Sequence, residues 1–167
     1  STYGVGKWHL CQINPKTGEG PRENWPLERG FERYYGTIYG TGSYWQPPTL
    51  FEDKQFIPHS TLPKDYYYTR SLGAAAVDML KKHNQKAPFF MYLSHFAPHG
   101  PLHALEEDIK AYKGVYDNGP KDTKLSRLKK HVSLGIIPKE WQRVTSDSLL
   151  KVWDTLKDSE KDLLIRK

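Results

Sequence analysis

The clearest hydrophobic signal in the chain is the unbroken run Phe89-Phe90-Met91-Tyr92-Leu93, which a proline precedes. A short run of this kind, rich in aromatic residues, is typical of a strand buried on both faces, as in a parallel sheet covered by helices. The apolar pattern stops before Ala97-Pro98-His99-Gly100-Pro101, where two prolines and a glycine exclude both a helix and a regular strand. We therefore predict a central strand that ends in a rigid loop carrying His99.

Four other stretches in the first half of the chain show weaker patterns. Residues 2–10 are aromatic and contain glycine, which favours a strand leading into a loop, whereas residues 14–30 are polar and read as loop. Residues 30–44 alternate aromatic residues with glycines, and this indicates an irregular segment packed by rings. Residues 50–65 are consistent with a short hairpin.

Helical periodicity appears before and after the central strand. Thr69 is a plausible N-cap of a helix whose apolar face carries Leu72, Ala76, Met79, Leu80 and His83. Two further stripes, at 105–112 and 125–132, predict helices that end at Gly114 and Gly135. Two short helices are expected near 149–153 and 163–165.

A net charge of +6 over 167 residues would suit an anionic partner. Five basic residues lie opposite the apolar stripe of the helix predicted at 125–132: Lys121, Lys124, Arg127, Lys129 and Lys130. Such a group can form a nucleic-acid interface, but it is more often the solvated face of an amphipathic helix, and we favour the second interpretation. We therefore expect no nucleic-acid partner.

The remaining composition sets limits on the class of protein. A single cysteine, Cys11, excludes an internal disulfide and a zinc site built on cysteines, and no apolar run is long enough to span a membrane. The chain begins as if within a strand and ends as if within a helix, so we expect a segment of a longer protein. The compartment cannot be read from the sequence.

Gly6-Lys7-Trp8-His9 places two polar groups on either side of a bulky ring. Residues i and i+2 of an extended chain point to the same side, so Lys7 and His9 can converge while Trp8 packs behind them. An ammonium group and an imidazole that converge at a strand end suit an oxyanion. His99 is the third candidate, because ligands bind outside the carboxyl ends of strands in open α/β sheets. The alternative for a lone histidine is a hydrogen-bonded place in a structural turn.

The histidines at 95, 99 and 103 offer a competing hypothesis, since four-residue spacing on a helix can gather metal ligands. Pro98 and Pro101 exclude that helix, and no glutamate follows His95 as in the zinc motif HExxH. We therefore assign no metal ligand in this chain.

Taken together, these landmarks resemble the sulfatase family. Gly6-Lys7-Trp8-His9-Leu10 is similar to the second sulfatase signature, and Arg29-Gly30-Phe31-Glu32 with Tyr35-Gly36 resembles the stretch that follows it. Pro88-Phe89-Phe90 with Ala97-Pro98-His99 and Pro101-Leu102 resembles the family's strand and histidine loop. The segment after it resembles the bacterial-type arylsulfatases in particular: Tyr112-Lys113-Gly114, Tyr116-Asp117, Gly119 and a basic helix.

The resemblance implies an α/β fold, part of an alkaline-phosphatase-like sheet covered by helices, with residues 1–167 as a partial catalytic domain truncated at both ends. It implies hydrolysis of sulfate esters by a formylglycine nucleophile, with a calcium ion that polarises the sulfate. By matching position, Lys7 binds a sulfate oxygen and the nucleophile, and His9 hydrogen-bonds the nucleophile. His99 contacts the sulfate near the leaving oxygen and can protonate it.

The sequence departs from the family pattern at several points. The nucleophile motif C/S-x-P/A-x-R is absent, since Gln12-Ile13-Asn14-Pro15 follows Cys11, and no calcium ligand can be named. We expect formylglycine, calcium and the rest of the sulfatase chain to come from elsewhere in the protein, and we expect this segment alone to be inactive.

Three further departures concern substrate choice. Arg70 and Ala74 stand where relatives often have acids, and Gly100 stands where a bulkier residue is common. A phosphodiester or phosphonate ester hydrolase of the same superfamily, and a non-catalytic anion-binding remnant, stay open as alternatives.

Overall fold

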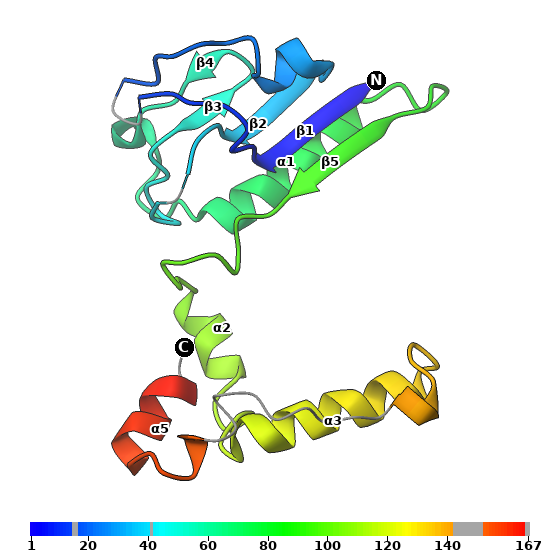
Figure 1. Ribbon diagram of the computed structural model, residues 1–167. Coiled ribbons are helices and arrows are strands. Elements are labelled where there is room, and N and C mark those ends of the chain that lie inside the picture. The colour runs from blue at the N-terminus through cyan, green and yellow to red at the C-terminus, as the bar shows by residue number, and fades with distance from the viewer. Residues whose placement is uncertain (15–16, 41, 142–151, 166–167) are drawn as a thin grey trace. The chain divides into compact units, whose positions relative to one another are not determined.

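The computed structural model covers residues 1–167 and describes all of them except 15–16, 41, 142–151 and 166–167. The described residues form two compact units, Ser1–His103 and Ala104–Lys167, coloured blue to green and green to red in Figure 1. The first unit contains every residue of the candidate site.

A five-stranded mixed sheet organises the first unit, in the order β4-β3-β2-β1-β5. β1 pairs in parallel with both β2 and β5, while β3 pairs antiparallel with β2 and β4: β1 Thr2–Lys7, β2 Arg33–Thr37, β3 Leu50–Glu52, β4 Gln55–Phe56 and β5 Phe90–Ser94. This arrangement confirms the α/β fold, the first strand and the hairpin near 50–65.

A glycine lets β1 and β5 approach closely at their carboxyl ends. Gly6 has φ +116°, a conformation that side chains rarely adopt, and a Cβ there would lie 1.8 Å from the carbonyl oxygen of Ser94. The pairing of Gly6 with Ser94 in the strand register therefore requires a residue without a side chain.

Helix α1, Tyr68–Lys82, packs along the sheet with the buried face Tyr68, Leu72, Ala76 and Met79 (Figure 1). Three of these four residues were expected from the periodicity. The N-cap prediction is wrong: the helix begins at Tyr68, after Tyr67, and no side chain caps it. The backbone carbonyl of Tyr44 accepts the N–H of Tyr68 at 2.7 Å, so tertiary structure satisfies one of the amides at the start of the helix.

Two expectations about strands need correction. The stretch 30–44 is not wholly irregular, because it contains β2, whose Tyr34 ring is buried and whose hydroxyl donates to the carbonyl oxygen of Gly6 at 2.6 Å. β5 is a parallel strand as expected, but it lies at the edge of the described sheet rather than in its centre. Phe90 is 59% exposed and Tyr92 46%, because β1 pairs with only one side of β5 and α1 covers only one face of the sheet.

The second unit is helical. It contains α2 (Glu106–Ala111), α3 (Gly119–Ser133), a 3-10 turn at Lys139–Trp141 and α5 (Asp158–Ile165). These confirm three of the four helices expected after the central strand, while the one near 149–153 lies largely outside the described residues. In the described part of the chain, no helix combines the length and apolar character needed to cross a membrane.

Candidate active site at the carboxyl ends of the parallel strands

The parallel strands β1, β2 and β5 bring three chain segments to one edge of the sheet. Lys7 is the last residue of β1 and pairs with Thr37, the last residue of β2, while Gly6 pairs with Ser94, the last residue of β5. The His99 loop leaves β5 from this edge. This register places Lys7 and the beginning of the His99 loop at the same end of the sheet, where the carboxyl ends of the parallel strands meet.

Phe96 lies between the two groups. The Nζ of Lys7 lies 5.4 Å from the centre of the buried Phe96 ring, and the imidazole of His99 stacks on the same ring at 5.2 Å between centroids, with 23° between the planes. Among the described residues no carboxylate pairs with Lys7, so its ammonium charge is balanced only by the ring face. This leaves a half-buried cation available to an anion.

The tautomer of His99 follows from its hydrogen bond. Nδ1 lies 2.8 Å from the carbonyl oxygen of Gly100, and a carbonyl can only accept, so Nδ1 carries a proton. Within the described part of the chain Nε2 makes no hydrogen bond, and the ring is exposed. His99 therefore presents Nε2 to a ligand, as an acceptor when the ring is neutral and as a donor when it is protonated.

His9 differs from the geometry on which the spacing argument rested. Its φ is +56°, so the chain is not extended through this residue, although histidine is one of the residues that tolerate such a conformation. The amide of His9 donates to the carbonyl oxygen of Ile38 at 2.9 Å, and its exposed ring meets Tyr39 edge-on at 5.4 Å. Convergence of His9 with Lys7 stays a prediction, but it can no longer rest on an i, i+2 alternation.

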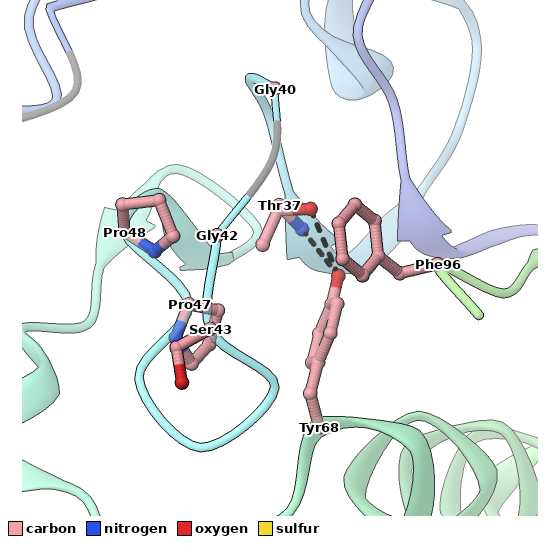
Figure 2. Close-up of a pocket in the computed structure, with 8 residues that line it drawn as sticks. All are labelled: Thr37, Gly40, Gly42, Ser43, Pro47, Pro48, Tyr68 and Phe96. Atoms are coloured by element: carbon pink, nitrogen blue, oxygen red, sulfur yellow. Dashed lines mark hydrogen bonds between the residues drawn. The ribbon is translucent and has the colours of Figure 1, made fainter. Parts of the chain in front are cut away.

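A network of tyrosine hydroxyls holds the strand ends beneath the site. The hydroxyl of Tyr68 lies 2.9 Å from the amide nitrogen of Thr37, which donates to it, and 3.1 Å from the Thr37 hydroxyl (Figure 2). The hydroxyl of Tyr34 bonds the carbonyl oxygens of Gly6 and Thr37. Burial raises the pKa of both Tyr34 and Tyr68 above the usual range, so both stay protonated donors.

A small pocket opens beside this network. The rings of Tyr68 and Phe96 form one side of it, and the loop after β2 forms the other (Figure 2). The other residues that line it are Thr37, Gly40, Gly42, Ser43, Pro47 and Pro48. Because Phe96 also contacts Lys7 and His99, the pocket adjoins the candidate site.

The structure separates the three histidines of the competing metal hypothesis. His103 packs its ring against Trp45 at 4.8 Å, and its Nδ1 accepts the amide of Tyr44 at 3.4 Å, whereas His99 faces Phe96. In the described ranges no three His, Cys, Asp or Glu side chains are grouped closely enough to hold a metal ion. His95 joins neither contact.

The neighbours of His99 were missed from the sequence. Phe96, Tyr44 and Tyr67 pack together, with Tyr44 donating its hydroxyl to the carbonyl oxygen of His99 at 2.9 Å. The aromatic residues of the stretch 30–44 were the available signal, but nothing in their spacing says which ring lies beneath a loop more than fifty residues further along the chain.

The chain is similar to known proteins in sequence and in fold. The model of the sulfatase family matches residues 1–162. An uncharacterized sulfatase of Schizosaccharomyces pombe is 30% identical over 96% of this chain and 30% of its own length, and an arylsulfatase of Klebsiella aerogenes is 28% identical over 88% and 34%. The solved structure of Ps i-CgsB in complex with k-i-k-neocarrahexaose matches 65% of this chain and 26% of its own, at 28% identity and a TM-score of 0.52. The chain thus spans about a third of the length of these two curated relatives.

Proposed function

Because the chain belongs to the sulfatase family, we propose that it supplies part of the active site of a sulfuric ester hydrolase similar to the arylsulfatases. In this proposal Lys7 and His99 bind the sulfate group, and His9 hydrogen-bonds the nucleophile. The observation that carries it is the shared Phe96 ring, which has an uncompensated ammonium and an imidazole with an available Nε2 packed on it at the carboxyl ends of parallel strands.

Each residue has a defined task. Lys7 offers its ammonium group to the sulfate oxygens. In water-poor surroundings a fixed positive charge stabilises the negative charge that develops during the reaction. Cleavage breaks the bond between sulfur and the ester oxygen, and that oxygen leaves with the electron pair. The protonated His99 donates the Nε2 proton to it, while Nδ1–H stays bonded to the carbonyl oxygen of Gly100 and keeps the ring oriented.

The formylglycine and the calcium ion that the family implies do not fit the residues that the structure describes. Cys11 lacks the motif for conversion to formylglycine, and burial raises the pKa of its half-buried thiol. The calcium ion finds no cluster of three ligands among the described residues. We therefore route no step through either group, and we expect the remainder of the sulfatase chain to supply both.

The chain alone should then be inactive. Loss of a covalent nucleophile removes the reaction path itself. We expect the purified segment to release no 4-nitrophenol from 4-nitrophenyl sulfate beyond the amount released by a heat-treated sample. Turnover above that control would contradict the division of the site between this chain and the rest of the protein.

The roles of Lys7 and His99 are tested in the full-length protein that contains this chain, on an alkyl sulfate and an activated aryl sulfate. Lys7→Ala should lower kcat/KM on both esters alike, because it holds the group that they share. His99→Ala should lose most of the about 10²–10⁴-fold contribution of general acid catalysis on the alkyl ester and clearly less on the aryl ester, whose phenolate leaves without a proton.

Lys82→Ala is the matched control, since Lys82 is an exposed lysine in an ion pair with Asp78 on α1. It should leave both values unchanged. Equal losses for His99→Ala on the two esters would remove the acid role and leave His99 as a sulfate ligand. Undiminished activity in Lys7→Ala would refute the site.

Two alternatives stay distinguishable. A phosphodiester or phosphonate ester hydrolase would show higher kcat/KM on those esters than on sulfates, because a tetrahedral anion site does not name its central atom. A non-catalytic remnant would bind sulfate without hydrolysis in the full-length protein and would lack the nucleophile motif there.

A further inference from the structure

The buried hydroxyl of Tyr34 contacts the ends of two strands at once. It lies 2.6 Å from the carbonyl oxygen of Gly6 and 3.1 Å from that of Thr37, and both of these oxygens can only accept. A hydroxyl has one proton, so the shorter contact, to Gly6, is the stronger hydrogen bond. Tyr34 is 2% exposed, so water has little access to that proton.

Tyr34 is itself held firmly in β2. Its amide donates to a carboxylate oxygen of Asp53 at 2.8 Å, and its carbonyl oxygen accepts the amide of Asp53 at 2.7 Å. Its ring belongs to a buried cluster whose other members are Ile13, Trp25, Ile38 and Phe51. The hydroxyl therefore donates from a fixed position.

The oxygen that accepts this bond belongs to the peptide that joins Gly6 to Lys7. A peptide is planar, so a bond to the Gly6 carbonyl also fixes the direction of the Lys7 amide. A Cβ at Gly36 would lie 1.8 Å from the same oxygen, so the glycine of β2 leaves the space that this oxygen occupies. Gly6 has no side chain that could pack and hold the peptide, and the Tyr34 hydroxyl takes over that task.

Lys7 depends on this peptide for the direction of its side chain. The side chain is long and flexible, and in the part of the chain that the structure describes its ammonium group has the Phe96 ring as its partner, 5.4 Å away. A rotation of the peptide before Lys7 would swing the base of the side chain and carry the ammonium group away from the ring.

We propose that Tyr34 is a positioning residue for Lys7: its hydroxyl, bonded to the Gly6 carbonyl, holds the lysine ammonium group where it meets the anion. The inference rests on the proposed function for the role of Lys7. Without the hydroxyl, two carbonyl oxygens would face the same gap with no donor between them, and the peptide before Lys7 would turn to relieve this.

The test is a double-mutant cycle in the full-length protein that contains this chain, with ethyl sulfate and 4-nitrophenyl sulfate as substrates. Tyr34→Phe should lower kcat/KM about tenfold on both esters, which is the scale of one buried hydrogen bond. Added to Lys7→Ala, it should lower kcat/KM by less than about twofold more, because no ammonium group is left to position. A further tenfold loss in the double variant, or no loss in Tyr34→Phe, would overturn the inference.

Tyr35→Phe is the matched control. Tyr35 is the next residue of β2 and points to the opposite face of the sheet, where its hydroxyl bonds that of Tyr66 at 3.1 Å. The variant removes a tyrosine hydroxyl from the same strand but leaves the bond to Gly6 intact, so kcat/KM should change by less than about twofold. A loss equal to that of Tyr34→Phe would assign the effect to the strand as a whole and contradict the positioning role.

A second variant covers the case in which Tyr34→Phe does not fold. Tyr34→4-aminophenylalanine keeps the ring and offers an N–H donor in place of the hydroxyl, so kcat/KM should stay within about threefold of the wild-type value. If this variant folds and loses as much activity as Lys7→Ala, the hydrogen bond does not position the lysine.

Sulfate binding separates this inference from the proposed function. Dissociation constants of inorganic sulfate are measured by calorimetry for the wild-type protein and the same variants. If Tyr34→Phe weakens binding only where Lys7 is present, and the wild-type protein hydrolyses neither ester, the hydrolase is refuted and the positioning role is supported. Turnover that requires Lys7 but not Tyr34 would do the reverse.

Discussion

Two histidines lie at opposite ends of the β1–β5 pair, and they are held in opposite ways. At the amino end His83 is 8% exposed, its Nδ1 accepts the hydroxyl of Tyr3 at 2.9 Å, and its Nε2 donates to the carbonyl oxygen of Ala87 at 2.8 Å. At the carboxyl end His99 is exposed and, among the residues that the structure describes, it hydrogen-bonds only through Nδ1. Both rings pack against a phenylalanine, Phe89 for His83 and Phe96 for His99.

The difference shows how a histidine can serve either the stability of the fold or the binding of a ligand. His83 joins the end of α1, the start of β1 and the turn before β5, and both of its ring nitrogens hydrogen-bond within the fold. His99 hydrogen-bonds its own loop through Nδ1, and its Nε2 has no hydrogen-bond partner among the described residues. A histidine that is half-satisfied at the ligand-binding edge of a sheet is a stronger candidate than one that is fully bonded.

The largest expected effect concerns the strand pair that both histidines flank. Gly6→Ala should destabilise the protein by about 4 kcal/mol, because the residue combines a left-handed φ with a Cβ position inside the Ser94 carbonyl. The measurement is urea unfolding of the full-length protein. Gly40→Ala is the control: it shares a positive φ but has no atom within 4 Å of the Cβ, and should cost only the backbone strain, about 1–2 kcal/mol. Equal losses in the two variants would contradict the close approach of β1 and β5.

The second effect tests the amino end. His83→Ala should lower the free energy of unfolding by about 3 kcal/mol, since it leaves a cavity and unsatisfied groups at Tyr3 and Ala87. The kcat/KM of the protein that remains folded should not change. His59→Ala, at an exposed histidine in a 3-10 turn, is the control and should alter stability by less than about 0.5 kcal/mol. A loss of activity in folded His83→Ala would show that the two ends are not independent.

The third effect concerns how the stability of the carboxyl end, where Tyr68 bonds Thr37, changes at alkaline pH. Burial raises the pKa of Tyr68, so above about pH 10 the unfolded chain loses this proton while the folded chain keeps it. The unfolded state then binds fewer protons and stability falls as pH rises.

Tyr68→Phe should cost about 1 kcal/mol at pH 7 through the bonds with Thr37. It should also make the decline above pH 10 shallower by up to about 1.4 kcal/mol per pH unit. Tyr112→Phe, at an exposed tyrosine, should leave the pH profile unchanged. An unaltered slope in Tyr68→Phe would mean that this hydroxyl titrates alike in both states.

The smallest expected effect is that of replacing His99, the counterpart of His83 at the carboxyl end. His99→Ala should change the free energy of unfolding by less than about 0.5 kcal/mol, because the lost bond is exposed and joins adjacent residues. Chemical denaturation of the full-length protein measures it. A loss comparable with that of His83→Ala would assign His99 to the fold and weaken the functional hypothesis.

The sequence predicted those parts of the fold that depend on local patterns. Two such features are confirmed, because both depend on residues close together in the chain. They are the apolar stripe of α1, formed by Leu72, Ala76 and Met79, and the proline-containing loop that carries His99. β2 was missed because its alternation of tyrosines and glycine makes sense only when the hydroxyl of Tyr34 reaches across to Gly6. The edge position of β5 was missed because hydrophobicity reports how apolar a strand is, and not how many strands pair with it.

The candidate site divides in the same way. Lys7 and His99 could be chosen from the sequence because strand ends and rigid loops are local features. Phe96, which both contact, and the left-handed backbone of His9 could not, since one depends on packing between distant segments and the other on a single backbone angle.

The open side of β5 has a practical consequence for work on this chain. Within the described ranges one edge of β5 is unpaired, and two residues of the strand, Phe90 and Tyr92, are exposed. Such an edge is a template onto which another extended segment can add. We therefore expect residues 1–167, when expressed by themselves, to self-associate through this strand as concentration rises. Replacing Tyr92 with lysine should raise the soluble yield, as charged residues at sheet edges do in natural proteins.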